Sequence, residues 1–116
     1  RVEQLVDVEE DQSYRDIVER GMWGVIYEES PSQAEHWTNM SIQVAGKTGT
    51  AEQTASDTNV CWFGCYAPSD DPKYVVVANV DGGDWGATTA MLVARDTLGA
   101  IYGEPDTSTA VYAAGD

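Results

Sequence analysis

The stretch Val44–Glu52 reads VAGKTGTAE and lies near the middle of a chain of 116 residues. Its length suits a β-strand, but Gly46 and Gly49 stand where bulky apolar residues would hold a sheet better. Glycine weakens the interior of a strand, and it often marks a place where another backbone or a ligand comes close. We therefore expect a strand at 41–52 that something else approaches.

Two further strands are predicted directly after this one. Residues 58–67 (TNVCWFGCYA) are rich in aromatic residues, and 73–80 contain the continuous apolar run YVVVANV, which is typical of a strand covered on both faces. The connection at 68–72 has five residues, which favours an antiparallel hairpin, since a parallel crossover needs about a dozen. The three strands should form an antiparallel meander.

Helices are predicted on both sides of these strands. Ser13 and Asp16 fit a capping box, and the apolar residues behind them recur at helical spacing, which predicts an amphipathic helix at 14–27. A second helix is expected at 87–102, closed by Gly103. Residues 28–40 are predicted to be a polar loop. The fold class is therefore α/β in composition, of the α+β type: a three-stranded antiparallel meander with flanking helices.

The ends of the chain are expected to differ from its middle. Residues 1–12 are predicted to be an extended lead-in, 13–103 the folded part, and 104–116 a disordered tail. The chain opens at Arg1 rather than at a methionine, which indicates a piece of a longer protein. No run approaches the ~18 apolar residues of a transmembrane helix.

The net charge of the chain limits the classes of partner that it is expected to bind. Six basic residues against twenty acidic ones give a formal net charge of −14, which argues against nucleic acid and anionic membrane surfaces. The acidic clusters are interpreted as solvated surface, and no metal site is expected. Cys61 and Cys65 would lie roughly 13 Å apart on one face of a strand, at ~3.3 Å per residue, which is too far for a disulfide. We expect both to be buried thiols.

The motif and the strand after it resemble a known family. AGKTGTAE at 45–52, followed by WFGCYAP at 62–68, is similar to the C-terminal part of penicillin-binding protein transpeptidase domains, above all the class B peptidoglycan D,D-transpeptidases. The resemblance runs from about residue 14 to 102. It implies that the meander is part of the penicillin-recognising sheet of this β-lactamase-like transpeptidase fold.

The resemblance also implies roles for the motif. Lys47 would be catalytic, because its charge attracts the substrate carboxylate and tunes proton transfer near the nucleophile. Thr48 and Thr50 would offer hydroxyls to that carboxylate, and Gly49 would let an extended peptide lie against the strand backbone. The Thr50 N–H would be one donor of the oxyanion hole. No metal or organic cofactor is implied.

Departures from the family pattern keep other interpretations open. The family uses a serine in S-x-x-K and a second motif S-x-N, and neither occurs in these 116 residues. Gly64-Cys65 stands where the family more often has an apolar residue and then glycine. We expect the intact parent to be an enzyme and this chain alone to be inactive. The alternatives are a non-catalytic module that senses β-lactams or binds partner proteins, and a carboxypeptidase or serine β-lactamase.

Partners and location follow from the same resemblance. In the intact parent, the expected ligands are the peptidoglycan stem peptide and β-lactams. The site would face outside the cytoplasmic membrane of a bacterium, with the anchor of the parent elsewhere in its chain. A half-built sheet leaves apolar surface and strand edges uncovered, so we expect the fragment to associate with itself.

Overall fold

The fold is a three-stranded antiparallel sheet with helices on both sides. The computed structural model describes residues 3, 12–52, 59–81 and 86–104. Its elements are α1 (Gln12–Tyr27), α2 (Pro31–Thr38), β1 (Ala45–Glu52), β2 (Asn59–Ala67), β3 (Tyr74–Asp81) and α3 (Gly86–Tyr102). The strands lie in the order β1-β2-β3, and both pairs are antiparallel. The predicted meander and its α+β class are confirmed.

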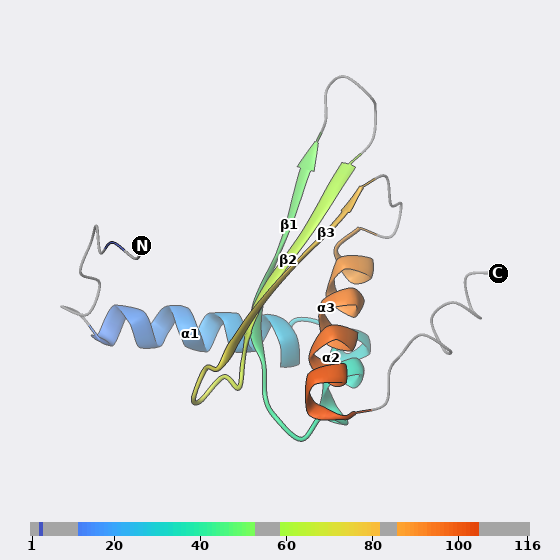
Figure 1. Cartoon of the computed structure of the whole chain (residues 1–116). Coiled ribbons are helices and arrows are strands. Elements are labelled where there is room, and N and C mark those ends of the chain that lie inside the picture. The colour runs from blue at the N-terminus through green and yellow to red at the C-terminus, as the bar shows by residue number, and fades with distance from the viewer. Residues whose placement is uncertain (1–2, 4–11, 53–58, 82–85, 105–116) are drawn as a thin grey trace.

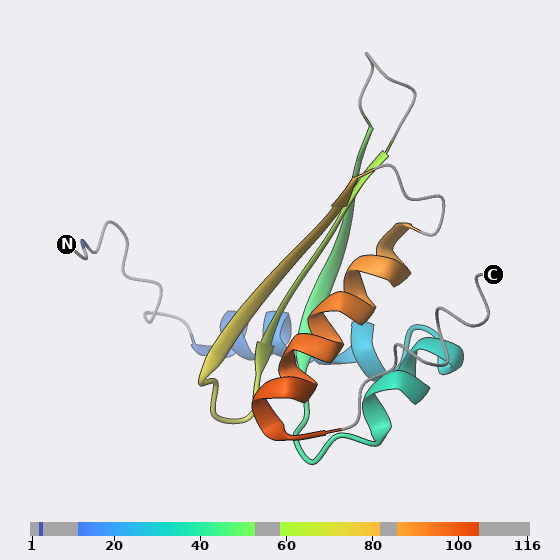
Figure 2. The same cartoon turned by 45° about the vertical axis from the view of Figure 1, so that its right-hand side comes forward.

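The two faces of the sheet are covered differently. Helix α3 runs along one face, whereas α1 crosses only the lower end of the sheet on the other side (Figures 1 and 2). Along β2, buried and more exposed residues alternate, as they do when one face packs on a core. The α3 side of β2 carries the buried residues Cys61, Phe63, Cys65 and Ala67.

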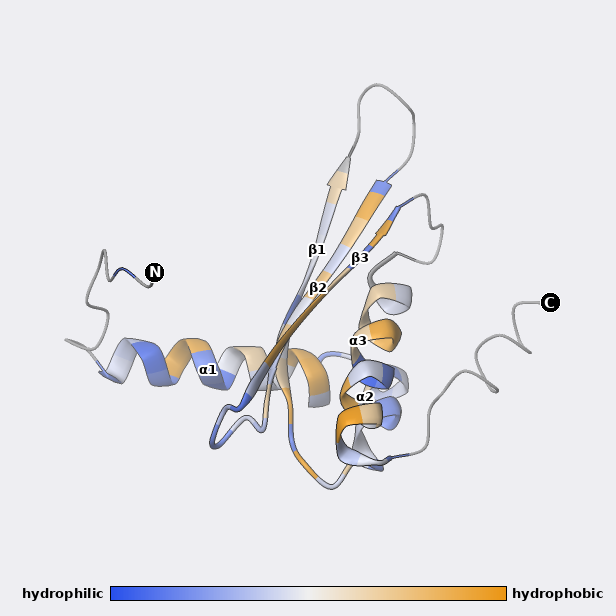
Figure 3. Cartoon of the chain, in the orientation of Figure 1, coloured by the Kyte–Doolittle hydropathy of each residue, from blue (hydrophilic) through white to orange (hydrophobic). Residues whose placement is uncertain are grey.

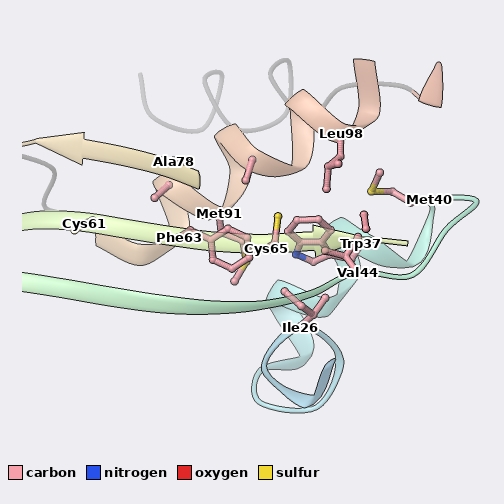
Figure 4. Close-up of a cluster of buried hydrophobic side chains, with 13 residues drawn as sticks. Ile26, Trp37, Met40, Val44, Cys61, Phe63, Cys65, Ala78, Met91 and Leu98 are labelled. Carbon is pink, nitrogen blue, oxygen red and sulfur yellow. The ribbon is translucent and has the colours of Figure 1, made fainter. Parts of the chain in front are cut away.

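The core lies between this face and the helices α2 and α3 (Figure 4). Helix α3 contributes a buried stripe at helical spacing, formed by Ala90, Met91, Ala94 and Leu98. The helix ends at Tyr102, and Gly103 follows it with a φ of 70°, which suits glycine and closes the last turn. The predicted helix at 87–102 is therefore confirmed to within one residue.

The predicted loop at 28–40 is wrong, because its middle forms α2. Ser30 has an extended backbone, and Pro31 follows as the first helical residue, where its missing N–H costs no hydrogen bond. The one large apolar residue of the helix is Trp37, which is buried with its ring 5.9 Å from that of Phe63. The packing of this one aromatic side chain in the core thus stabilises a short helix whose composition predicts a loop.

The expectation that β3 is covered on both faces is also wrong for the part of the chain that the structure describes. Val75 and Val77 are 76% and 62% exposed, although β3 is hydrophobic along most of its length (Figure 3). Ala78 on the other face is buried against α3. The apolar run therefore predicts a strand correctly, but only one of its faces finds a partner here.

Two element starts differ from the prediction. Helix α1 begins at Gln12, so Ser13 lies in its first turn instead of capping it from outside. The apolar stripe of α1 packs only at its C-terminal end, where Ile26 is buried, while Tyr14 and Ile17 are exposed. Strand β1 begins at Ala45, and residues 41–44 lead into it without strand pairing.

The cysteines and the chain ends complete the comparison. Cys61 and Cys65 are free and buried, as predicted. Most of the predicted lead-in and residues 105–116 of the predicted tail lie outside the described residues. Glu104, the first residue of that tail, is placed: its N–H donates to the Gly99 carbonyl at 2.8 Å, and its carboxylate accepts the Ser41 N–H at 2.9 Å.

The burial of Cys65 predicts a pH-dependent loss of stability. Burial raises the pKa of its thiol from 9.0 to about 11, against a smaller lowering by a hydrogen bond with the Val76 backbone. Between these values the folded state holds a proton that the unfolded state releases, so the free energy of unfolding should fall as pH rises from 9 to 11. The loss should be roughly 2–3 kcal/mol.

Urea unfolding at several pH values measures this effect. The matched variant Cys65→Ala lacks the titrating thiol, so its free energy of unfolding should depend much less on pH in the same window. Equal pH dependence in the two proteins would contradict the assignment to Cys65.

Candidate functional site

The candidate site is the edge strand β1, which carries all four residues predicted for binding and catalysis. Lys47 pairs with Gly64 of β2, and Gly49 pairs with Trp62. Because side chains alternate along a strand, Lys47 lies on the face opposite α3, and Thr48 and Thr50 lie on the α3 side. The structure therefore brings the four residues onto one strand but places the ammonium group and the two hydroxyl groups on opposite faces.

Because β1 is an edge strand, one ligand can contact side chains on both of its faces. Strand β1 pairs with β2 on one side only among the described residues, so its outer backbone groups are open to an added strand. Lys47, Gly49 and Thr50 are exposed, and Thr48 is half-buried. A peptide lying along this edge could contact the strand backbone and reach side chains on both faces.

Lys47 differs from the other basic residues that the structure describes. Its ammonium group donates to the carbonyl of Thr48 at 2.9 Å, and no carboxylate lies within ion-pair distance among the described side chains. The other four described cations each pair with an acid: Arg15 with Glu19, Arg20 with Glu28, Lys73 with Asp71, and Arg95 with Asp96. In a chain of net charge −14, an exposed cation without an acidic partner is available to an anionic ligand.

The two glycines of the motif serve different purposes. A Cβ atom on Gly46 would lie 2.7 Å from the Phe63 ring and 2.9 Å from the Gly64 carbonyl, so internal packing requires glycine there. A Cβ atom on Gly49 would meet only Trp62 Cβ at 3.8 Å, an ordinary contact. Neither backbone conformation nor packing therefore demands glycine at 49, which leaves the approach of an external molecule as a reason for it.

Gly64 extends the open surface beside Lys47. It lies opposite Lys47 on β2, and a Cβ atom there would meet only a methyl group of Val77 at 4.0 Å. Trp62, 47% exposed, stands next to it on the same face. With glycine at 64, this chain has more room beside its motif lysine than a larger side chain there would leave.

Sequence reasoning missed the residues that hold the segment leading into β1. The Trp23 indole N–H donates to the Gln43 side-chain oxygen at 3.1 Å, and the Val44 N–H donates to the Tyr27 hydroxyl at 3.0 Å. Burial raises the pKa of Tyr27, and the hydrogen bond from Val44 lowers it by less. The spacing of two aromatic residues four apart on one helix was a usable signal for their contact, but their partners lie 17 to 20 residues away.

The structure offers little for other chemistry. Among the described residues, no group of three or more histidine, cysteine, aspartate or glutamate side chains lies close enough to hold a metal ion. His36, half-buried on α2, accepts a hydrogen bond at its backbone carbonyl from the Arg95 guanidinium at 2.9 Å. The exposed motif on β1 therefore remains the strongest candidate site.

Comparisons with known proteins match most of the chain. A sequence profile described as penicillin binding protein transpeptidase domain matches residues 7–99. The chain is 27% identical over 97 residues to peptidoglycan D,D-transpeptidase MrdA of Haemophilus influenzae, covering 72% of this chain and 15% of that protein. It is 38% identical over 71 residues to peptidoglycan D,D-transpeptidase PbpA of Mycolicibacterium smegmatis, covering 54% of this chain and 14% of that protein. The chain thus spans about one seventh of the length of these relatives.

The two motif glycines provide a matched test of this geometry. Gly46→Ala should lower the free energy of unfolding by about 1–3 kcal/mol, because the added methyl group forces Phe63 or the strand backbone to shift. Gly49→Ala, the same substitution three residues away on an open position, should change it by less than about 1 kcal/mol. Urea unfolding of both variants measures the difference, and equal destabilisation would contradict the distinct roles given to the two glycines.

Proposed function

Because the chain belongs to the penicillin-binding protein transpeptidase domain family, we propose that it is the C-terminal part of a peptidoglycan D,D-transpeptidase that also binds β-lactams. The observation that carries this proposal is the motif on β1: an exposed lysine with no acidic partner among the described residues and, two residues later, a glycine that internal packing does not require. The nucleophilic serine would come from the remainder of the parent protein, since this sequence has neither S-x-x-K nor S-x-N.

In this proposal the substrate is an extended peptide that ends in a carboxylate. It would lie along the open edge of β1 and make main-chain hydrogen bonds beside Gly49. Lys47 would attract the terminal carboxylate, and the hydroxyl groups of Thr48 and Thr50 would donate hydrogen bonds to it. Residues on both faces of the strand can contribute because the ligand occupies the edge between them.

The reaction would be acyl transfer through the serine of the parent. Its hydroxyl oxygen attacks the carbonyl of the penultimate D-alanine, and the terminal D-alanine leaves with a proton, so that a serine ester remains. The amine of a neighbouring stem peptide then attacks this ester, forms the cross-linking amide and releases the serine. The Thr50 N–H would stabilise the oxyanion of each tetrahedral intermediate, an effect typically worth about 3 kcal/mol per donor.

β-Lactams would acylate the same serine by opening of the lactam ring. The cleaved amide nitrogen stays attached to the acyl group, so no leaving group departs and the ester persists. The carboxylate common to penicillins would occupy the position of the peptide carboxylate beside Lys47. This shared anion is the reason that one motif serves both ligands.

We place the site at the extracytoplasmic face of the bacterial cytoplasmic membrane, where peptidoglycan is assembled. The structure, within the residues it describes, has no helix that is long and apolar enough to span a membrane. By resemblance to the family, the parent would carry its membrane anchor in another segment of its chain. No metal or organic cofactor enters the proposed mechanism.

The parent protein provides the direct test of Lys47. Fluorescent penicillin should label the intact parent covalently, and Lys47→Ala should lower the second-order rate constant of labelling by roughly a hundredfold or more. The matched control is Lys73→Ala, which removes the other lysine, an exposed residue paired with Asp71 in a turn. Its labelling rate should equal that of the wild type.

Three outcomes discriminate the alternatives. This chain alone should take up no covalent label, because catalysis collapses when the nucleophile is missing. A parent without S-x-x-K and S-x-N that binds penicillin reversibly would support the non-catalytic module instead. Release of the terminal D-alanine without cross-linking would indicate a carboxypeptidase, and rapid penicillin hydrolysis would indicate a β-lactamase.

The exposed apolar face of the sheet supports the proposal that further chain covers it in the parent. Val75 and Val77 of β3 and Trp62 of β2 lie on the face opposite α3 and are largely exposed. The outer edge of β3 is unpaired among the described residues. Apolar side chains beside a free strand edge form a surface that monomeric proteins normally cover.

We therefore expect this chain in isolation to associate through that face. Light scattering coupled to size exclusion should give the mass of a dimer or larger species, although the charge of −14 opposes close approach. The double variant Val75→Thr/Val77→Thr should shift the mass toward the monomer, because threonine keeps the strand propensity and removes apolar surface. Val93→Thr, an exposed valine on α3, should leave the mass unchanged. A folded wild-type chain that is strictly monomeric would contradict this expectation.

A further inference from the structure

The segment that enters β1 is held by two aromatic residues from the last turns of α1. Trp23 binds the side chain of Gln43, and Tyr27 accepts the backbone N–H of Val44, the residue directly before the strand. Consecutive residues of the segment are thus held by consecutive turns of one helix. We call Trp23 and Tyr27 the aromatic clamp.

The aromatic clamp is itself held in place by its surroundings. The two rings pack against each other with their centroids 4.9 Å apart. The Arg20 guanidinium lies 4.6 Å from the centre of the Trp23 ring and forms an ion pair with Glu28 at 2.7 Å. Ile26, between the two aromatic residues in sequence, is fully buried in the core. The end of α1 therefore presents the clamp from a packed position.

The hydrogen bond to Tyr27 satisfies a buried backbone N–H at the entry to β1. Val44 is fully buried, so its N–H cannot turn to water and needs an acceptor inside the protein. The Tyr27 hydroxyl supplies that acceptor at 3.0 Å. On the other side, the Gln43 carbonyl accepts the N–H of Ser69 at 2.8 Å, which ties the same segment to the turn after β2.

Because the aromatic clamp lies close to the motif, a small change in the direction of the strand at the clamp would displace Lys47. Lys47 follows Val44 by three residues, so their Cα atoms are about 10 Å apart along an extended strand. A tilt of the strand by about 6° at Val44 would move Lys47 by about 1 Å. A misplacement of about 1 Å can lower the rate of an enzymatic step by as much as a hundredfold.

We propose that Tyr27, assisted by Trp23, is a positioning residue that sets the direction of β1 and so the placement of Lys47 and Gly49 beside the acylated serine. The inference rests on the proposed function, because it concerns the same site. Tyr27 touches neither substrate nor nucleophile in this proposal. It acts through the Val44 N–H and the course of the strand.

The experiment uses the intact parent protein and fluorescent penicillin. Tyr27→Phe removes the hydroxyl that accepts the Val44 N–H and keeps the ring that packs on Trp23. The matched control is Tyr14→Phe, the same substitution on the same helix at an exposed position. Two quantities are recorded for each protein: the second-order rate constant of labelling and the final labelled fraction.

A positioning role and a merely structural role give different results. If Tyr27 positions the strand, Tyr27→Phe should reach the same final labelled fraction as the wild type, with a rate constant lowered roughly 5- to 50-fold. Tyr14→Phe should match the wild type in both quantities. A lowered final fraction with an unchanged rate constant would show that Tyr27 only stabilises the fold and would overturn the inference, as would a wild-type rate.

A second variant decides the case if Tyr27→Phe does not fold. Trp23→Phe keeps an aromatic ring beside Tyr27 and removes the pyrrole part of the indole, including the N–H donated to the exposed Gln43 side chain. It should lower the labelling rate constant by about two- to fivefold at a full final fraction, and an unchanged rate would overturn the inference. Absence of labelling in the wild-type parent would refute the proposed function itself, whereas normal wild-type labelling with unaffected variants refutes only the positioning role.

Discussion

The close contact between Phe63 and Gly46 is the constraint on which the arrangement of this sheet depends. The Phe63 ring occupies the space that a side chain at position 46 would need, so β1 and β2 meet at this register without a shift of Phe63 or the backbone only if residue 46 is glycine. Phe63 is in turn fully buried and packs on Trp37 of α2. One contact thus joins the edge strand to the core and determines where the motif that follows Gly46 is presented.

The candidate site residues lie where this packing stops. On the α3 side the sheet is covered by a helix whose small residues allow close approach, and on the other side it is covered only at its lower end by α1. Lys47, Gly49 and Gly64 all lie on the open side, next to one another across two strands. Val75 and Val77 are exposed on the same open face. The surface that could bind a ligand is therefore continuous with an apolar surface that another part of the parent could cover.

Polar side chains connect the helices to one another and to the entry of β1. Arg95, 3% exposed on α3, donates to the carbonyl of His36 at the end of α2, and Glu104 accepts the N–H of Ser41. Glu104 and Tyr27 thus hold the segment 41–44, which has no strand pairing of its own. Because buried backbone groups must find partners, such contacts favour one path of the chain from α2 into the motif.

Local residue patterns were sufficient for the strands, for α3 and for the identity of the motif. The β-branched run at 74–80, the five-residue turn and the alanine-rich stripe ending at Gly103 each reflect forces that act between near neighbours, so they can be recognised without coordinates. Local patterns do not show which residues pack against each apolar surface. The mostly polar segment at 31–38 forms a helix because its Trp37 packs against Phe63, which is distant in the sequence. Val75 stays exposed because no described residue covers it. Likewise, the sequence singles out Lys47 and Gly49, but only the folded chain shows that the lysine has no acidic partner among the described residues and that packing does not demand glycine at 49. Only the folded chain shows that Tyr27 holds the entry to the strand. These properties depend on contacts between residues far apart in the chain, and such contacts arise only when the helices and the sheet pack together.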